Sequence, residues 1–99
     1  MGALPTAAGR LVVTDQKTTI AIQNLMPPPP GKSYHLWGIT NGQKLSCGKL
    51  TPNSTGTIYK TIASDKILME ATTFMVTIEP AEEMPQPTGD TVMMGSGTI

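Results

Sequence analysis

The chain has 99 residues, of which 38% are hydrophobic and 14% are charged, and seven basic residues balance seven acidic ones. This length is typical of one domain. A net charge of zero, without a cluster of Lys and Arg, argues against binding of nucleic acids or anionic membranes. Threonine, glycine and proline are frequent, which favours strands and turns because β-branched side chains suit a pleated surface.

Cysteine content and hydropathy exclude further classes of structure. Cys47 is the lone cysteine, so an intrachain disulfide is excluded. No stretch approaches the roughly 20 apolar residues that span a bilayer. The first residues, 1–5, lack the basic and apolar regions of a signal peptide. That start fits a cytoplasmic protein, and it fits equally a domain that belongs to a longer exported protein.

The N-terminal part predicts a tail followed by a strand pair. Residues 1–9 are small and unpatterned, and we expect a flexible tail or linker there. Strands are predicted at 11–14 and 18–25, joined by a short turn. In the second of them Ile20 and Ile22 share one face, which is the alternation of a half-buried strand.

A proline run, Pro27–Pro30, follows the first strand pair. Such a run predicts polyproline II, which at about 3.1 Å per residue makes a rigid connector of roughly 12 Å. Pro27 and Pro30 also match the minimal motif that polyproline-binding domains read. Because the run lies between two predicted strands, we favour the connector over the ligand interpretation.

The next predicted element is a hairpin. Its first strand, 33–40, carries Tyr34 on one face and Trp37 on the other, which predicts a central strand covered on both sides. Asn41-Gly42 is a strong turn signal because both residues tolerate positive φ. The return strand is predicted at 43–50.

The second half predicts three more strands. The strand at 57–62 is followed by a segment, 63–72, whose spacing is partly helical but which has no strong cap. A strand at 74–80 alternates clearly, and Pro80 should end its pairing because proline cannot donate to the ladder. A last strand is predicted at 91–94.

About seven short strands with turn signals between them predict an all-β fold. We expect an antiparallel β-sandwich, immunoglobulin-like or a related Greek key. The sandwich should span residues 10–95, with flexible tails at 1–9 and 96–99.

The candidates for catalysis and ligand binding are few. His35 and Cys47 lie on adjacent predicted strands, but nothing supplies the third group that an activated thiol needs, and we expect a non-enzyme. Tyr34 and Trp37 could form a platform for a sugar or peptide, although core positions are the more common role of aromatics.

Metal binding is also weakly supported. Glu79, Glu82 and Glu83 form the densest acidic group and could bind a cation, but such a run is more often a solvated loop. We therefore expect no metal and no cofactor.

Two segments resemble the C-terminal extracytoplasmic domain of the anti-sigma-K factor family of bacterial membrane proteins. The first is Leu25 through Trp37, which matches a proline-rich entry followed by Gly-Lys-x-Tyr-x-Leu-Trp. The second is Val76 through Gly89, where Val-Thr-x-Glu-Pro and Pro-Gln-Pro-Thr-Gly are matched. The chain departs from the family at Ala81-Glu82-Glu83, where Ala-Gly-Gly is usual. The residues that carry the resemblance, as structural or interaction positions, are Pro30, Gly31, Tyr34, Leu36, Trp37, Thr77, Glu79, Pro80, Pro85, Gln86, Pro87, Thr88 and Gly89.

The resemblance implies a function divided across a membrane. Members hold a sigma factor in the cytoplasm, cross the membrane once and export this domain, and proteolysis releases the sigma factor. The chain would then be a non-enzymatic extracytoplasmic sensing or regulatory domain, periplasmic or at the cell surface. Its partners would be proteins, such as a regulatory protease or a second copy, with no nucleic acid and no small-molecule substrate. The alternatives are a stand-alone secreted or periplasmic sandwich that binds a carbohydrate or peptide and, more remotely, a small cysteine hydrolase.

Overall fold

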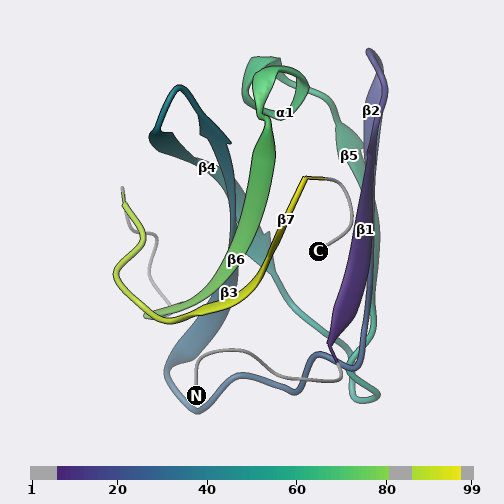
Figure 1. Cartoon of the computed structure of the whole chain (residues 1–99). Helices are drawn as coiled ribbons and strands as arrows, with labels where there is room; N and C mark the ends of the chain where they lie inside the picture. Colours follow the sequence, from purple (N-terminus) through teal and green to yellow (C-terminus); the bar gives the residue numbers. More distant parts are fainter. Residues whose placement is uncertain (1–6, 81–85, 97–99) are drawn as a thin grey trace.

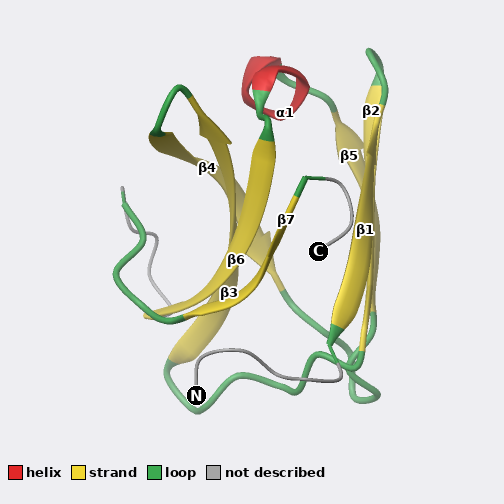
Figure 2. Cartoon of the chain, in the orientation of Figure 1, coloured by secondary structure: helices red, strands yellow, loops and turns green. Residues whose placement is uncertain are grey.

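The computed structural model describes residues 7–80 and 86–96, which form seven strands and one short helix (Figures 1 and 2). This confirms the predicted all-β fold. The elements in chain order are β1 (Ala8–Val13), β2 (Lys17–Gln23), β3 (Lys32–Thr40), β4 (Gln43–Leu50), β5 (Ile58–Ala63), α1 (Lys66–Glu70), β6 (Thr73–Pro80) and β7 (Thr91–Gly95).

The strands form two sheets that face each other (Figure 1). One sheet has three strands in the order β1-β2-β5, and the other has four in the order β4-β3-β6-β7. All neighbouring strands are antiparallel. An immunoglobulin-type sandwich divides its strands in a similar way, with A, B and E in one sheet and C, F and G in the other, and in the variable type C′ is added beside C.

The main core lies between the two sheets. Because side chains alternate along a strand, each sheet turns one apolar face toward the other sheet. Ile20 and Ile22 of β2 are buried there, as their spacing predicted. The other buried members of this core are Leu11, Leu25, Tyr34, Leu36, Leu50, Ile58, Leu68, Phe74, Val76, Val92 and Met93.

The strand β3 is central, as predicted, because it pairs with β4 on one edge and with β6 on the other. Residues 34–38 are all buried, so both of its faces are covered. The turn to β4 has φ 50° at Asn41 and 76° at Gly42, which are the positive values that a tight hairpin turn requires.

The start of β1 differs from the prediction. The strand begins at Ala8, which pairs with Gln23, whereas the pattern placed its start at residue 11 and a tail before it. Ala8 and Gly9 therefore lie in the sheet. Backbone pairing needs no apolar side chain, so small residues can join a strand without leaving an alternating pattern.

The ambiguous segment 63–72 contains α1. Asp65 is its N-cap, and its carboxylate accepts a hydrogen bond of 2.8 Å from the backbone N–H of Leu68. Our prediction missed this cap, although Asp three residues before a buried apolar residue is a recognised helix start. The bond fixes the helix so that Leu68 enters the core.

Candidate functional site

Five residues of the family motif meet at the outer face of the four-stranded sheet. Side chains of β3 and β6 that point away from the main core form a second buried layer, which includes Trp37, Met75, Thr77 and Glu79. Trp37, Thr77 and Glu79 each have 0% of their surface exposed. A buried layer that contains a carboxylate must satisfy that carboxylate with hydrogen bonds, because an unpaired buried charge is very costly.

Within this layer the strands are joined by a chain of hydrogen bonds. The indole Nε1–H of Trp37 donates to Thr77 Oγ1 at 2.8 Å, and the Thr77 hydroxyl donates to Glu79 Oε2 at 2.5 Å. Thr77 and Glu79 are two residues apart on β6 and therefore share a face. Each buried donor along this chain has an acceptor.

The other side of the carboxylate holds the segment that leads into β7. The Thr88 backbone N–H lies 3.0 and 3.1 Å from the two carboxylate oxygens of Glu79, and the Thr88 hydroxyl donates to Oε1 at 2.7 Å. The backbone N–H of Gly89 donates to Oε2 at 3.1 Å. Residues 86–90 run outside the four-stranded sheet, on the side away from the three-stranded sheet (Figure 1). We call Trp37, Thr77, Glu79, Thr88 and Gly89 the Glu79 network.

These contacts set the ionisation of Glu79. Burial disfavours the charged form and by itself raises the pKa. The hydrogen bonds from Thr77, Thr88 and Gly89 outweigh burial and lower the pKa of Glu79 to about 2. The carboxylate is therefore ionised at neutral pH and acts as an acceptor of hydrogen bonds. This arrangement suits an anchor, whereas a general acid or base works with a pKa near the ambient pH.

Gly89 is required by a close approach of two backbones. A Cβ atom at this position would lie 1.6 Å from the carbonyl oxygen of Ile78, so no side chain fits. On the other side of Gly89, the N–H of Ile78 donates to the carbonyl of Asp90 at 3.0 Å. The Thr-Gly pair of the motif thus places two N–H groups on Glu79 and brings the chain back onto β6.

The earlier motif residues have different structural roles. Leu36 is fully buried in the main core. Tyr34 is also buried, which raises the pKa of its phenol, and the protonated hydroxyl donates to the carbonyl of Met26 at 2.5 Å. Pro30 and Gly31 are exposed in the turn before β3. None of these four residues joins the Glu79 network.

The remaining motif residues flank the network. Pro80 is the last residue of β6 and pairs with Lys32, so strand pairing ends where predicted. Gln86 donates a long hydrogen bond of 3.5 Å to the carbonyl of Lys44, and Pro87 is half-buried. Pro85 and the Ala81-Glu82-Glu83 departure lie outside the described residues.

His35 and Cys47 do not form a pair. The imidazole of His35 lies on the outer face, stacked on Trp37 with 4.6 Å between ring centroids, and its Nε2 lies 2.7 Å from Ser46 Oγ. Cys47 instead packs against the main core. Burial, with a smaller contribution from the charge of Asp65, raises the pKa of the Cys47 thiol to about 11, so the thiolate is scarce.

A β-bulge interrupts the hairpin beside Cys47. Leu36 pairs with Gly48 but Trp37 pairs with Ser46, so Cys47 is an extra residue in β4. The separation from His35 does not depend on this bulge, because unbroken pairing from the turn would also place Cys47 opposite Leu36 on the inner face. His35 is the neighbour of Leu36 in β3 and therefore points to the outer face.

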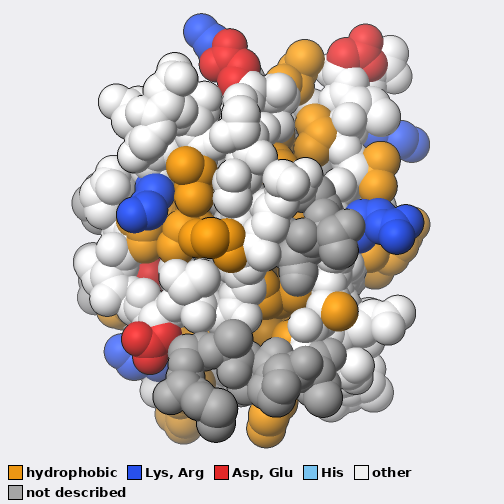
Figure 3. Space-filling model, viewed as in Figure 1, with side chains coloured by type: hydrophobic (Ala, Val, Ile, Leu, Met, Phe, Trp, Pro, Cys, Tyr) orange, Lys and Arg blue, Asp and Glu red, His pale blue; other side chains and the backbone are white. Residues whose placement is uncertain are grey.

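Aromatic side chains do not form a binding platform at the predicted place. Tyr34 and Trp37 are 2% and 0% exposed, which confirms the core interpretation for both. Across the described ranges, no group of three or more His, Cys, Asp or Glu could hold a metal ion. Figure 3 shows charges of both signs scattered over one face of the molecule.

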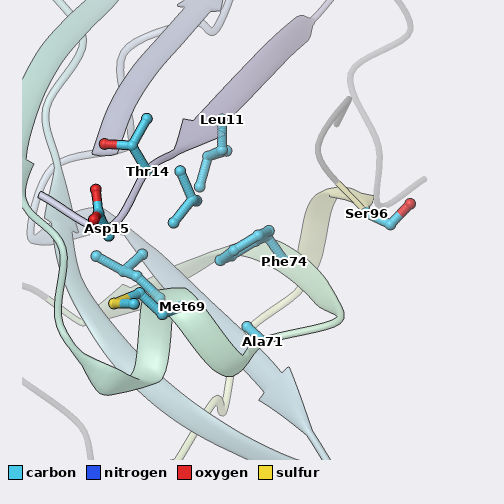
Figure 4. A pocket seen from close by; sticks show the side chains of 9 residues that line it. Leu11, Thr14, Asp15, Met69, Ala71, Phe74 and Ser96 are labelled. Atoms are coloured by element: carbon cyan, nitrogen blue, oxygen red, sulfur yellow. The ribbon is translucent and has the colours of Figure 1, made fainter. Parts of the chain in front are cut away.

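A hollow of about 400 Å³ lies at the end of the sandwich near α1. Figure 4 shows side chains of the β1–β2 hairpin, of α1 and of β6 around it, including Leu11, Asp15, Met69 and Phe74. Its polar lining comes from Thr14, Asp15 and Ser96. The Thr14 hydroxyl already donates to the carbonyl of Lys17 at 2.9 Å within the turn. This lining offers no paired acid and base and no nucleophile with a base beside it.

A family of known proteins matches this chain over a range that contains the Glu79 network. The model of the family "Anti-sigma-K factor rskA, C-terminal" matches residues 3–93 and so includes the whole Glu79 network. The chain belongs to this family. It is also 30% identical over 76 residues to the anti-sigma-K factor RskA of Mycobacterium ulcerans (strain Agy99). That match covers 76% of this chain and 32% of the relative, so the chain spans about a third of the relative's length. No solved structure matches the chain significantly.

Among the described residues, no helix is long and apolar enough to cross a membrane. The helix α1 has five residues. The match over residues 3–93 confirms the resemblance to the C-terminal domain of this family.

Proposed function

We propose that this chain is the extracytoplasmic regulatory domain of a membrane-anchored anti-sigma factor. The observation that carries the proposal is the family match over residues 3–93. Five of the motif residues build the connected Glu79 network in this fold, which supports a shared architecture with the RskA family. In the parent protein, a sigma-binding region and a membrane segment would lie outside this chain.

The domain would act without catalysis. Three observations support this: the thiol of Cys47 has a raised pKa, His35 lies on the other face of the sheet, and Glu79 is held as an ionised acceptor. Each of these groups is used in packing or in hydrogen bonds within the fold. We infer that Cys47, His35 and Glu79 stabilise the fold.

The regulatory role would depend on stability. A folded sandwich resists proteolysis because cleavage requires extended, accessible chain, and local unfolding supplies such chain only rarely. The partners would be a regulatory protease and, through the cytoplasmic region, a sigma factor. A protein partner that binds one state of the domain better than another would shift the exposure of a cleavage site nearby.

The test uses the full-length parent protein in its own cells. One strain carries the wild type, and a second carries the parent with this domain replaced by an unstructured Gly/Ser linker. We expect faster cleavage of the parent and higher activity of a sigma-dependent reporter in the second strain. Unchanged parent half-life and unchanged reporter activity would overturn the proposal.

Two point variants of different stability extend the same test. Gly89→Ala should shorten the half-life of the parent because a Cβ atom there would collide with the Ile78 carbonyl. Gly42→Ala is the matched control, since a Cβ at Gly42 meets nothing within 4 Å. If the proposal is right, reporter activity rises from the wild type to Gly42→Ala to Gly89→Ala, as the stability of the domain falls.

A further inference from the structure

The segment that joins the two sheets, Met26–Pro30, has an unusually restricted backbone. Four of its residues precede a proline, which disfavours the helical region, and each proline fixes its own φ near −65°. Both restrictions favour polyproline II. The sequence of the segment therefore favours an extended left-handed conformation, which has no hydrogen bonds between neighbouring turns.

This conformation continues to the end of the run. The N–H of Lys32 donates to the carbonyl of Pro29 at 3.0 Å, and Gly31 has φ 77°. Proline followed by a residue with positive φ at the two central positions is typical of a type II turn. Pro30 keeps an extended ψ in such a turn, so the run ends only at Gly31.

Both ends of the run are fixed to the folded body, since the turn from Pro29 to Lys32 leads directly into β3 and two contacts hold the N-terminal end. Leu25 is fully buried, and its N–H donates to the carbonyl of Gly56 at 2.9 Å. The buried Tyr34 hydroxyl holds the carbonyl of Met26. A partner would therefore meet an ordered segment, and little conformational entropy would be lost on binding.

The run presents one ridge to solvent. Pro27, Pro29 and Pro30 are exposed, whereas Pro28 is half-buried. Polyproline II has three residues per turn, so Pro27 and Pro30 lie on the same ridge. Met26 is 63% exposed, and the segment runs along the lower edge of the molecule (Figure 1).

We propose that Met26–Pro30 is a preformed polyproline II ligand for a partner protein with an aromatic-lined groove. Such grooves read two prolines three residues apart, which is the spacing of Pro27 and Pro30. The exposed Lys32 places a positive charge two residues beyond the second proline. The partner therefore also carries a carboxylate at one end of its groove. This inference is independent of the anti-sigma proposal, because it concerns a surface of the isolated domain.

The test is a titration of the ¹⁵N-labelled chain with an SH3 domain that reads Pro-x-x-Pro-x-Lys ligands. We expect shift changes confined to the amides of Met26 and residues 31–34. A free peptide of residues 24–34 serves as the reference, and the folded chain should bind at least as tightly because its segment is already ordered. Absence of binding by the folded chain overturns the proposal, whether or not the peptide binds.

Matched variants test the ridge itself. Replacing Pro27 and Pro30 together by Ala should weaken binding by at least about tenfold, and Pro28→Ala by less than about threefold. The indole N–H signal of Trp37 reports in each variant that the sandwich is intact. Equal losses from the double variant and from Pro28→Ala would show that the ridge is not what the partner reads, and the proposal would be wrong.

Discussion

The two faces of the four-stranded sheet are buried by different physics. The inner face, which includes Leu36 and Val76, is apolar and packs against the three-stranded sheet. The outer face buries Trp37, Thr77 and Glu79, and its contacts are directional hydrogen bonds. Both faces come from the same strands, since alternate residues of β3 and β6 point to opposite sides.

This difference explains where the family signature lies. Apolar packing tolerates exchange among side chains of similar volume, so an inner face can change its residues and keep its fold. A buried carboxylate needs particular donors at particular places, and removing one leaves a costly unsatisfied group. We infer that Trp37, Thr77 and Glu79 belong to the recognisable motif because residues of the outer face are harder to replace.

The largest effect should come from Gly89→Ala. The added Cβ would overlap the Ile78 carbonyl oxygen, so either the strand or the segment 86–90 must move. We expect a loss of about 3 kcal/mol or more in the free energy of unfolding. Urea unfolding measures it, with Gly42→Ala as control at about 1 kcal/mol for its positive φ. Equal losses in the two variants would contradict the close approach at Gly89.

Glu79→Gln should come next. The amide keeps the shape of the side chain but loses the charge and turns an NH₂ group toward the N–H donors of Thr88 and Gly89. We expect a loss of about 2–3 kcal/mol, which is typical of hydrogen bonds to a charged group. On the inner face, Leu36→Met should cost less than about 1.5 kcal/mol. If Glu79→Gln lowered the free energy of unfolding less than Leu36→Met, the outer face would not be the harder one to substitute.

The same variant tests the ionisation of Glu79. Its pKa in the folded state, about 2, is lower than the ordinary 4.5, so its contribution is fully present above pH 4.5 and is lost as pH falls toward 2. In that window unfolding of the wild type should take up as much as about one proton more than unfolding of Glu79→Gln. Chemical unfolding at a series of pH values measures this difference. Parallel profiles would show that the carboxylate is not stabilised by folding.

Thr77→Val is nearly isosteric and should have a smaller effect. It removes the acceptor of the Trp37 indole N–H and one donor to Glu79. We expect a loss of about 1–2 kcal/mol and faster hydrogen exchange of that indole proton. Thr19→Val, on the solvent side of the three-stranded sheet, is the control and should change stability by about 0.5 kcal/mol or less. An indole proton that exchanges as slowly as in the wild type would contradict the hydrogen-bond chain.

The last prediction concerns the rate at which the Cys47 thiol is labelled, and it involves no substitution and no change in stability. Because its thiol packs against the inner core and has a pKa of about 11, alkylation by iodoacetamide at pH 8 should be slow in the folded protein. We expect at least about tenfold faster labelling in urea, where the thiol returns to its ordinary pKa of about 8.5. Equal rates would mean that the thiol is accessible and reactive in the fold.

Much of this architecture follows from local sequence patterns. The alternation of β2 and β6, the Asn41-Gly42 turn and the end of pairing at Pro80 were predicted and are observed. The start of β1 and the capped helix α1 were not, because small residues leave no pattern and a single cap residue is easily overlooked. The motif residues were predicted as a set, without the bonds that join them.

By itself the sequence determined which residues share a face of each strand, since strand alternation depends only on neighbours along the chain. It also determined the family, through short runs of residues. Tertiary structure alone decided that Glu79 meets Thr88 and Gly89, and that Cys47 is the extra residue of a bulge between β3 and β4. Those outcomes depend on the register between strands and on the return of the chain onto β6, and no local pattern contains that information.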